Sequence, residues 1–202
     1  MTPFTVEIYK VETDRLWQTT CDYVEPLVNA FKVIPGIVSG YFGLQLQDSQ
    51  QLYFIQVWES LEKHREVLAS PAAWDAAKQR VEVISSKQES YHALFDADPR
   101  PALSAPCTEI LRVTANEGVA RETVLSILTS LGETLQTIPG VVGPATGLVA
   151  EDDQSIAFVC GWQSFEHFAS SVKSATVQEK IGQIKPLATA ELKHSVLSSY
   201  KE

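Results

Sequence analysis

The chain has 202 residues, 45% of them hydrophobic, and carries 16 basic against 25 acidic side chains for a formal net charge of −9. This acidic balance, with no basic patch in either half, argues against nucleic acid as a partner. No apolar run has the length of a membrane span, and the first residues lack the basic and apolar blocks of a signal peptide. We therefore expect a cytoplasmic protein that does not enter a membrane.

The first hundred residues predict the element order β-α-β-β-α-β. We expect strands at 6–11, 38–47, 52–58 and 90–95, and helices from about 14 to 31 and from about 60 to 81. Pro26 lies inside the first helical pattern and predicts a kink or a late start. Gly40 and Gly43 in the second strand indicate a bend or the close approach of another segment. Ser60 is placed to cap the second helix.

The same plan returns in the second hundred residues. Between residues 34 and 62, a constant offset of 104 gives 12 identities in 29 positions, where residue frequencies would give about two. The repeated strands are expected at 108–113, 142–150, 155–162 and 191–197, with helices at 122–135 and 164–187. We predict two units, 1–97 and 107–202, joined by a proline-rich linker at 98–106.

This order is that of a ferredoxin-like α+β unit, in which two helices cover one face of a four-stranded antiparallel sheet. The third strand of each unit is apolar on both faces, for example at Tyr53 and Phe54 in the first. Helices can bury only one face, and exposing the other would forgo about 25 cal/mol per Å². The two sheets are therefore expected to pack face to face as an intramolecular, pseudo-dimeric α+β barrel.

Three further segments resemble a known family. They are Ile34-Pro35-Gly36 before the second strand, Trp58-Glu59-Ser60 with Glu62 after the third, and Ser70-Pro71-Ala72-Ala73-Trp74, and the first two return at 138–140 and 162–166. The pattern resembles the dimeric α+β barrel superfamily, and within it the antibiotic biosynthesis monooxygenase (ABM) type, written twice.

That resemblance implies a cofactor-independent oxygenase, or a cyclase of polyketide-like substrates, working in a pocket between helices and sheet. It equally admits a non-catalytic small-molecule-binding or stress-associated barrel. Related barrels degrade haem and carry a haem-ligating His on the second helix. Lys78 occupies that place here, and Lys180-Ile181-Gly182 has no His either, so haem degradation is the least favoured of these functions.

The candidate catalytic residues are His64 and Tyr53, as an acid or base and a phenol that orients a carbonyl or passes a proton. The candidate substrate-binding residues are Trp58, Tyr41, His92 and Phe54, as walls of a flat apolar pocket. Each has a plainer structural interpretation. The tryptophan and phenylalanine can be core residues, the tyrosines can reflect strand propensity, and His92 recurs as His194, which suggests an architectural hydrogen bond.

The tyrosines are distributed unequally between the units. Tyr9, Tyr41, Tyr53 and Tyr91 correspond to Leu111, Ala145, Ala157 and Lys193, and His64 corresponds to Phe168. We therefore expect any active pocket to lie in the first unit.

The sequence has no phosphate-binding glycine loop, no metal-ligand spacing and no Gly-x-Ser-x-Gly elbow. Cys21, Cys107 and Cys160 stand far apart and form no zinc or disulfide pattern. We expect no cofactor and no metal, and acid–base chemistry on an apolar or aromatic small molecule. Because the two units are joined, a monomer can close the barrel by itself, and the outer helices leave a further homodimer open.

Overall fold

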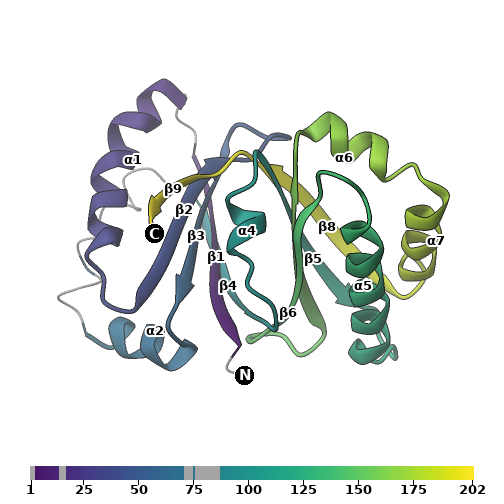
Figure 1. The fold of residues 1–202 in the computed structure, drawn as a ribbon. Helices are drawn as coiled ribbons and strands as arrows, with labels where there is room; N and C mark the ends of the chain where they lie inside the picture. The colour runs from purple at the N-terminus through teal and green to yellow at the C-terminus, as the bar shows by residue number, and fades with distance from the viewer. Residues whose placement is uncertain (1–2, 14–16, 71–74, 76–86) are drawn as a thin grey trace.

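The computed structural model describes residues 3–13, 17–70, 75 and 87–202 (Figure 1). The elements are, in chain order, β1 (Phe4–Glu12), α1 (Trp17–Lys32), β2 (Ile37–Leu44), β3 (Gln51–Trp58), α2 (Leu61–Leu68), β4 (Lys87–Phe95), α4 (Arg100–Leu103), β5 (Cys107–Ala115), α5 (Arg121–Gln136), β6 (Val142–Val149), β7 (Ser155–Trp162), α6 (Phe165–Ser171), α7 (Ala175–Ile184), β8 (Ala188–Ser195) and β9 (Ser198–Lys201). Among the described helices none is both long and apolar enough to cross a membrane.

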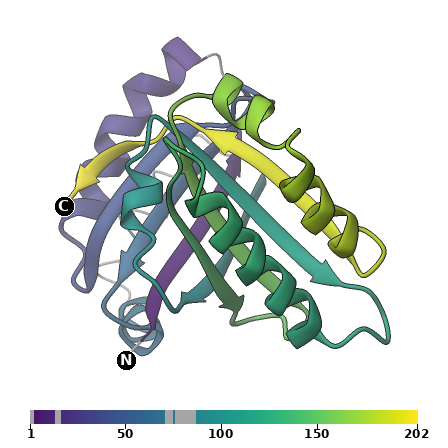
Figure 2. The ribbon, with the colours of Figure 1, turned by 45° about the vertical axis from the view of Figure 1, so that its right-hand side comes forward.

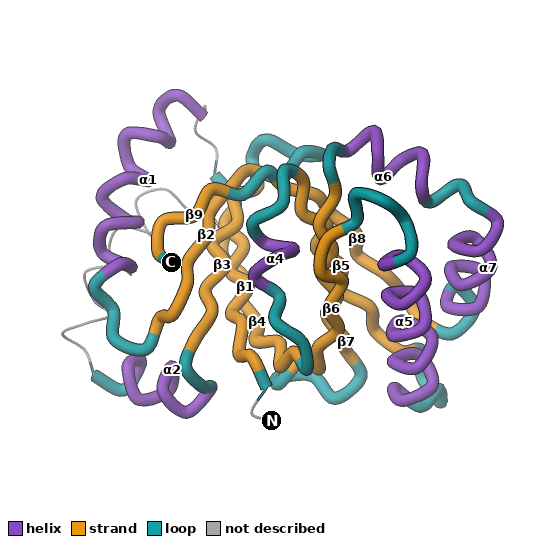
Figure 3. The backbone as a smooth tube through the Cα atoms, in the orientation of Figure 1, coloured by secondary structure: helices purple, strands orange, loops and turns teal. Residues whose placement is uncertain are grey.

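The strands form one antiparallel sheet in the order β8-β5-β7-β6-β4-β1-β3-β2-β9. The sheet curls until its ends meet, because Gln45 after β2 bridges to Ser195 at the end of β8. Helices α1 and α2 cover the strands of the N-terminal half, β1 to β4, and α5, α6 and α7 cover those of the C-terminal half, β5 to β8 (Figures 1 and 3). The turned view shows α5 running in much the same direction as strand β5 (Figure 2).

Strand β3 is buried on both faces, as its sequence predicts. Tyr53, Ile55 and Val57 belong to an inner core that lies between the strands of the two halves. Phe54 and Trp58 belong to an outer core between sheet and helices. Successive side chains of a strand point to opposite faces, so an uninterrupted apolar strand needs cover on both sides, and the curled sheet supplies it.

The C-terminal segment crosses to the N-terminal half, which the sequence analysis missed. Strand β8 ends at Ser195, and β9 then pairs with β2 and brings Tyr200 into the outer core against Phe31. The predicted close approach at the two glycines of β2 is confirmed. A Cβ on Gly40 would lie 2.2 Å from the Tyr200 ring, and one on Gly43 would lie 2.2 Å from the Val196 carbonyl oxygen.

The expected linker contains a short helix, α4, that packs into the inner core of the barrel. Ala102 and Leu103 of α4 are fully buried and belong to the inner core. Figure 1 shows α4 between the two helix layers. The segment at 98–106 therefore contributes to packing as well as joining the halves.

Other boundaries differ where tertiary contacts intervene. Strand β2 ends at Leu44 because the chain there turns toward β8, and Leu46 N–H donates to the His194 carbonyl at 2.7 Å. The helix expected at 164–187 is two helices, α6 and α7. Pro26 lies inside α1 without delaying its start. Most of the expected helix beyond residue 70 lies outside the described residues.

Candidate functional site

A carboxyl group is buried on strand β1 of the N-terminal half. Glu7 pairs with Gln56 of β3 on one side and with His92 of β4 on the other. Its neighbours Val6 and Ile8 belong to the inner core, so strand alternation directs Glu7 to the helix-covered face. His92 lies directly opposite and shares that face.

Helix α2 brings a histidine onto the same spot. Ser60 caps the helix, its Oγ accepting from the Lys63 N–H at 3.0 Å, as the sequence predicts. This fixes the first turn so that His64 packs on Trp58, with ring centroids 4.2 Å apart. His64 Nε2 lies 3.7 Å from Glu7 Oε2. The Trp-x-Ser pattern thus positions an aromatic ring and the imidazole that packs on it.

The polar groups continue as a chain into the other half of the molecule. His64 Nδ1 lies 2.6 Å from His92 Nε2. His92 Nδ1 contacts Glu151 Oε1, and the His92 backbone N–H donates to Glu151 Oε2 at 2.9 Å. Glu151 follows β6, so the N-terminal site is completed by a residue of the C-terminal half.

The partners of His92 determine where its proton lies. A carboxylate only accepts hydrogen bonds, so His92 Nδ1 carries the hydrogen that faces Glu151. His92 Nε2 then offers its lone pair to His64 Nδ1–H, and His64 Nε2 offers its lone pair toward Glu7. A directional chain of titratable groups therefore runs from buried Glu7 to half-exposed Glu151.

Burial dominates the protonation of this chain. It raises the pKa of Glu7 to about 7, which the nearby Trp58 indole partly offsets and the charge of Glu151 reinforces. Although this indole lowers the pKa, Trp58 Nε1 has no partner with hydrogen-bond geometry among the described residues. Burial and the neighbouring His92 lower the pKa of His64 to about 4. Near pH 6 the chain therefore holds a neutral carboxylic acid beside neutral imidazole.

The C-terminal half has the same positions with different chemistry. Glu109 of β5 pairs with His194 of β8 as Glu7 pairs with His92. Here Trp162 Nε1 does donate to Glu109 Oε2, at 2.9 Å. The two halves thus share a buried carboxyl group and a tryptophan but differ in the hydrogen bond between them.

Two replacements interrupt the polar chain in this half. Phe168 stands where His64 stands in the other half, with its ring 4.1 Å from the His194 ring. Gln47 stands where Glu151 stands. Its Oε1 accepts from the His194 backbone N–H at 3.0 Å, so its Nε2 must donate to His194 Nδ1, at 2.8 Å. His194 Nε2 then carries the hydrogen, and it has no partner among the described residues.

A cavity of about 450 Å³ opens beside Glu109, between the sheet and the helices of the C-terminal half. Its walls are mostly apolar side chains from helices α5 and α7 and from strands β5 and β8. They include Leu128, Leu131, Leu135, Val177, Ile181 and Ile184. Phe168 and Trp162, which donates a hydrogen bond to Glu109, also line it.

Glu109 supplies the carboxyl group that lines this cavity. Burial raises its pKa to about 7, and the hydrogen bond from Trp162 partly opposes that rise. An apolar cavity with one convergent carboxyl group of shifted pKa is the usual form of a small-molecule site. Such a carboxyl group can exchange a proton with a ligand near neutral pH.

The structure brings some of the candidate residues together and separates others. Trp58, His64 and His92 meet on the helix-covered face, and Phe54 lies in the same outer core. Tyr41 and Tyr53 lie in the inner core on the opposite face of the sheet. The structure therefore does not bring Tyr53 to His64.

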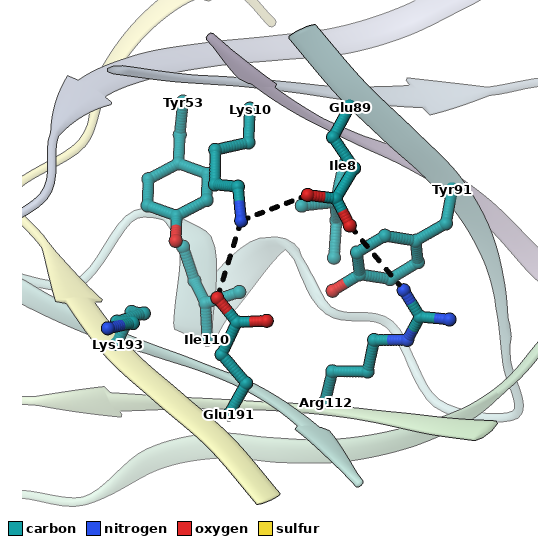
Figure 4. A pocket seen from close by; sticks show the side chains of 9 residues that line it. All are labelled: Ile8, Lys10, Tyr53, Glu89, Tyr91, Ile110, Arg112, Glu191 and Lys193. Carbon is teal, nitrogen blue, oxygen red and sulfur yellow. Dashed lines mark hydrogen bonds and ion pairs between the residues drawn. The ribbon is translucent and has the colours of Figure 1, made fainter. Parts of the chain in front are cut away.

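Tyr53 instead lines the charged mouth of the barrel (Figure 4). Lys10 Nζ bridges Glu89 at 3.1 Å and Glu191 at 3.3 Å. Arg112 lies over the Tyr91 ring, 5.0 Å from its centroid. The space left beside Tyr53 is about 20 Å³, room for about a single water molecule. A more polar space of about 190 Å³ is lined by the same Lys10, Glu89 and Glu191.

Neither of the two buried carboxyl groups, Glu7 and Glu109, was predicted from the sequence as a site residue. The available signal was a glutamate that recurs in the first strand of each half, as Val6-Glu7-Ile8 and Thr108-Glu109-Ile110. A carboxyl group on a buried strand face is rarely placed there without a partner. Glu151 and Gln47 could not be assigned, because their contacts cross between the halves.

No family model matches the chain, and no curated protein matches it in sequence. Solved structures share its fold over the full length. A presumed monooxygenase from Lactobacillus acidophilus NCFM superposes with a TM-score of 0.70 at 16% identity, covering 100% of this chain and 98% of the other. An anthrone oxidase-like protein gives a TM-score of 0.75 at 11% identity, covering 100% and 97%.

A haem-binding protein from Thermus thermophilus is also similar, with a TM-score of 0.62 at 9% identity and coverage of 99% and 93%. At these identities the similarity shows the fold and nothing finer. The chain is a mixed α/β protein with the curled antiparallel sheet of these monooxygenase-like structures.

Proposed function

We propose that this protein is a small-molecule enzyme that removes a proton from an apolar, aromatic substrate, with Glu109 as the general base. The observation that carries the proposal is the cavity of about 450 Å³ whose buried carboxyl group has a pKa of about 7. A base is most effective when its pKa lies near the working pH. The apolar walls select a neutral, flat ligand, and Trp162 offers a surface on which it can stack.

The reaction that fits this site is cofactor-independent oxidation of an acidic methylene group by molecular oxygen. Glu109 takes the first C–H proton, and the carbanion reduces the oxygen molecule and forms a C–O bond to it. Glu109 returns the proton to give a hydroperoxide, then removes the second C–H proton as the O–O bond breaks. The departing hydroxide takes that proton, so the methylene group and one oxygen molecule become a carbonyl group and water. The presumed monooxygenase and the anthrone oxidase-like protein, which share the fold, support this reaction class.

Two alternatives use the same cavity. A polyketide-type cyclase would need the same proton removal followed by aldol closure, without oxygen. A non-catalytic binding or stress-associated protein would use the apolar cavity alone. Haem is a poorer fit, because the described residues that line the cavity include no His, Cys, Met or Tyr to ligate iron. Lys78, which the sequence places where haem-degrading relatives have a haem-ligating His, lies outside the described residues.

The architecture of the proposal is a duplicated ABM-like, ferredoxin-like unit, residues 1–97 and 107–202, in a cytoplasmic monomer. The equivalent contacts of Glu7 and Glu109, and the common offset of the sequence motifs, support it. A pocket in the N-terminal half, served by His64 and Tyr53, stays a prediction. Residues 71–74 and 76–86, where the sequence places the end of the second helix, lie outside the described residues.

Oxygen uptake with a tricyclic anthrone tests the proposed reaction. We expect uptake with one carbonyl product per oxygen molecule, and a fall in kcat of about 10²–10⁴-fold in Glu109→Gln, the usual contribution of a general base. In the wild type, kcat/KM should rise with pH through a pKa near 7. The exposed Glu133→Gln on α5 is the matched control and should retain full activity.

Each outcome has a distinct meaning. Binding of the anthrone with cyclised product and no oxygen uptake supports the cyclase. Binding without turnover supports the binding protein. Undiminished oxygen uptake by folded Glu109→Gln overturns the assignment of the base.

A further inference from the structure

Three metal-ligating side chains converge in the N-terminal half. Glu7, His64 and His92 each offer one ligand atom, and these atoms all lie within 4.8 Å of one another. The side chains are 6%, 2% and 12% exposed. They come from β1, α2 and β4, so only the tertiary structure assembles them.

The orientation of His92 suits a metal ligand. Glu151 holds the Nδ1 hydrogen, so the Nε2 lone pair points into the cluster. A ligating histidine usually donates its other ring N–H to an outer carboxylate, which fixes its tautomer and raises its basicity. The backbone N–H of His92 also binds Glu151, at 2.9 Å, and keeps that carboxylate in place.

The charges of the cluster match a divalent cation. With Glu7 and Glu151 ionised and both imidazoles neutral, a dication brings the formal charge of these four side chains to zero. A buried charge is tolerated only when it is paired in this way. Two imidazoles and one carboxylate are ligands for first-row transition metals such as Zn²⁺, Co²⁺ and Fe²⁺.

We propose that Glu7, His64 and His92 bind one divalent first-row transition-metal ion, with Glu151 as the outer carboxylate that orients His92. The three ligand atoms lie within 4.8 Å of one another, against the roughly 3.3 Å between ligand atoms on a tetrahedral zinc ion. The two histidine nitrogens, now 2.6 Å apart, must separate as the ion replaces the hydrogen between them. Three protein ligands leave at least one position for water.

The C-terminal half contains the same backbone positions without the site. Phe168 replaces one ligand, and Gln47 leaves the hydrogen of His194 on Nε2, the atom that would bind a metal. The molecule therefore carries its own negative control, and the proposal requires a single ion per chain.

Titration of chelator-treated protein with Co²⁺ is the direct test. We expect visible d–d absorption that saturates at one equivalent and is displaced by Zn²⁺. His64→Phe, which copies Phe168, should weaken binding by more than the roughly 10–100-fold expected for loss of the outer carboxylate in Glu151→Gln. Glu109→Gln, at the equivalent position in the other half, should bind Co²⁺ as the wild type does.

Absence of a stoichiometric Co²⁺ signal in folded wild-type protein overturns the proposal. So does undiminished binding by folded His64→Phe. If His64→Phe does not fold, Glu151→Gln decides, because Glu151 is half exposed. In either negative case the cluster is a hydrogen-bonded chain without a metal. The proposal is independent of the oxidation, because Co²⁺ binding is measured without substrate.

Discussion

The two halves of this molecule place the same backbone positions around a buried glutamate and then differ at two side chains. In the N-terminal half, Glu7 is followed by His64, His92 and Glu151, an unbroken line of titratable groups. In the C-terminal half, Glu109 is followed by Phe168, His194 and Gln47, and the line is interrupted twice. The first half therefore concentrates polar ligands, and the second opens an apolar cavity beside a single carboxyl group.

The difference shows how the neighbour of a histidine determines which ring nitrogen carries the hydrogen. Glu151 and Gln47 make the same pair of contacts, one with a backbone N–H and one with a ring nitrogen. The carboxylate accepts from Nδ1 and the amide donates to it, so His92 and His194 present opposite tautomers to the interior. A single Glu/Gln difference thus decides whether the inner nitrogen is a lone pair or an N–H.

The most demanding test places the equivalents of His64 and Glu151 around Glu109 and His194. The double variant Phe168→His with Gln47→Glu should bind a second equivalent of Co²⁺, where the wild type binds one. Phe168→His alone should bind the second ion about 10–100-fold more weakly, because the outer carboxylate is then missing. A folded double variant that still saturates at one equivalent would contradict the argument from tautomers.

The pH dependence of the free energy of unfolding reports the ionisation of Glu109. Its folded pKa of about 7 lies above the ordinary 4.5, so between pH 4.5 and 7 the folded state keeps a proton that the unfolded state loses. Wild-type stability should therefore lose about 3 kcal/mol from this group as pH rises through that window, and change little above it. Glu109→Gln lacks this loss.

Urea unfolding of both proteins at pH 4.5 and pH 8 measures the effect. Burial lowers the pKa of His194 to about 4, which makes stability rise between pH 4 and 6.5. Wild type and variant share that contribution, so it largely cancels in their difference. A stability difference that is the same at both pH values would show that Glu109 ionises normally in the folded protein.

The smallest expected change is the difference in unfolding free energy between variants of the two tryptophans, Trp162 and Trp58. Trp162→Phe removes a hydrogen bond to a buried carboxyl group, whereas Trp58→Phe removes an indole N–H that has no such bond with a described residue. We expect the free energy of unfolding to fall by about 1–2 kcal/mol more in Trp162→Phe. Urea unfolding at pH 8 checks this, and the similar loss of ring volume is the internal control. Equal losses would mean that the two indoles are equivalent.

Much of the local structure could be predicted from the sequence. The two-sided burial of β3, the Ser60 cap and the close approach at Gly40 and Gly43 all follow from strand period, capping chemistry and the absence of a side chain. The same alternation explains why Tyr53 and Trp58, five residues apart on one strand, lie on opposite faces. The candidate catalytic pair Tyr53 and His64 therefore lies on opposite faces of the sheet, which follows from the assembled fold.

The order of the main strands and helices, the repeated motifs and the need for cover on both faces of the sheet follow from the sequence alone, because they depend on local periodicity and on apolar area. Which polar side chains meet depends on the tertiary structure. Glu7, His64, His92 and Glu151 come from four separate segments, and their contacts depend on strand register and on how the sheet closes. The position of β9 also depends on the tertiary structure, because its partner strand β2 lies more than 150 residues earlier in the chain.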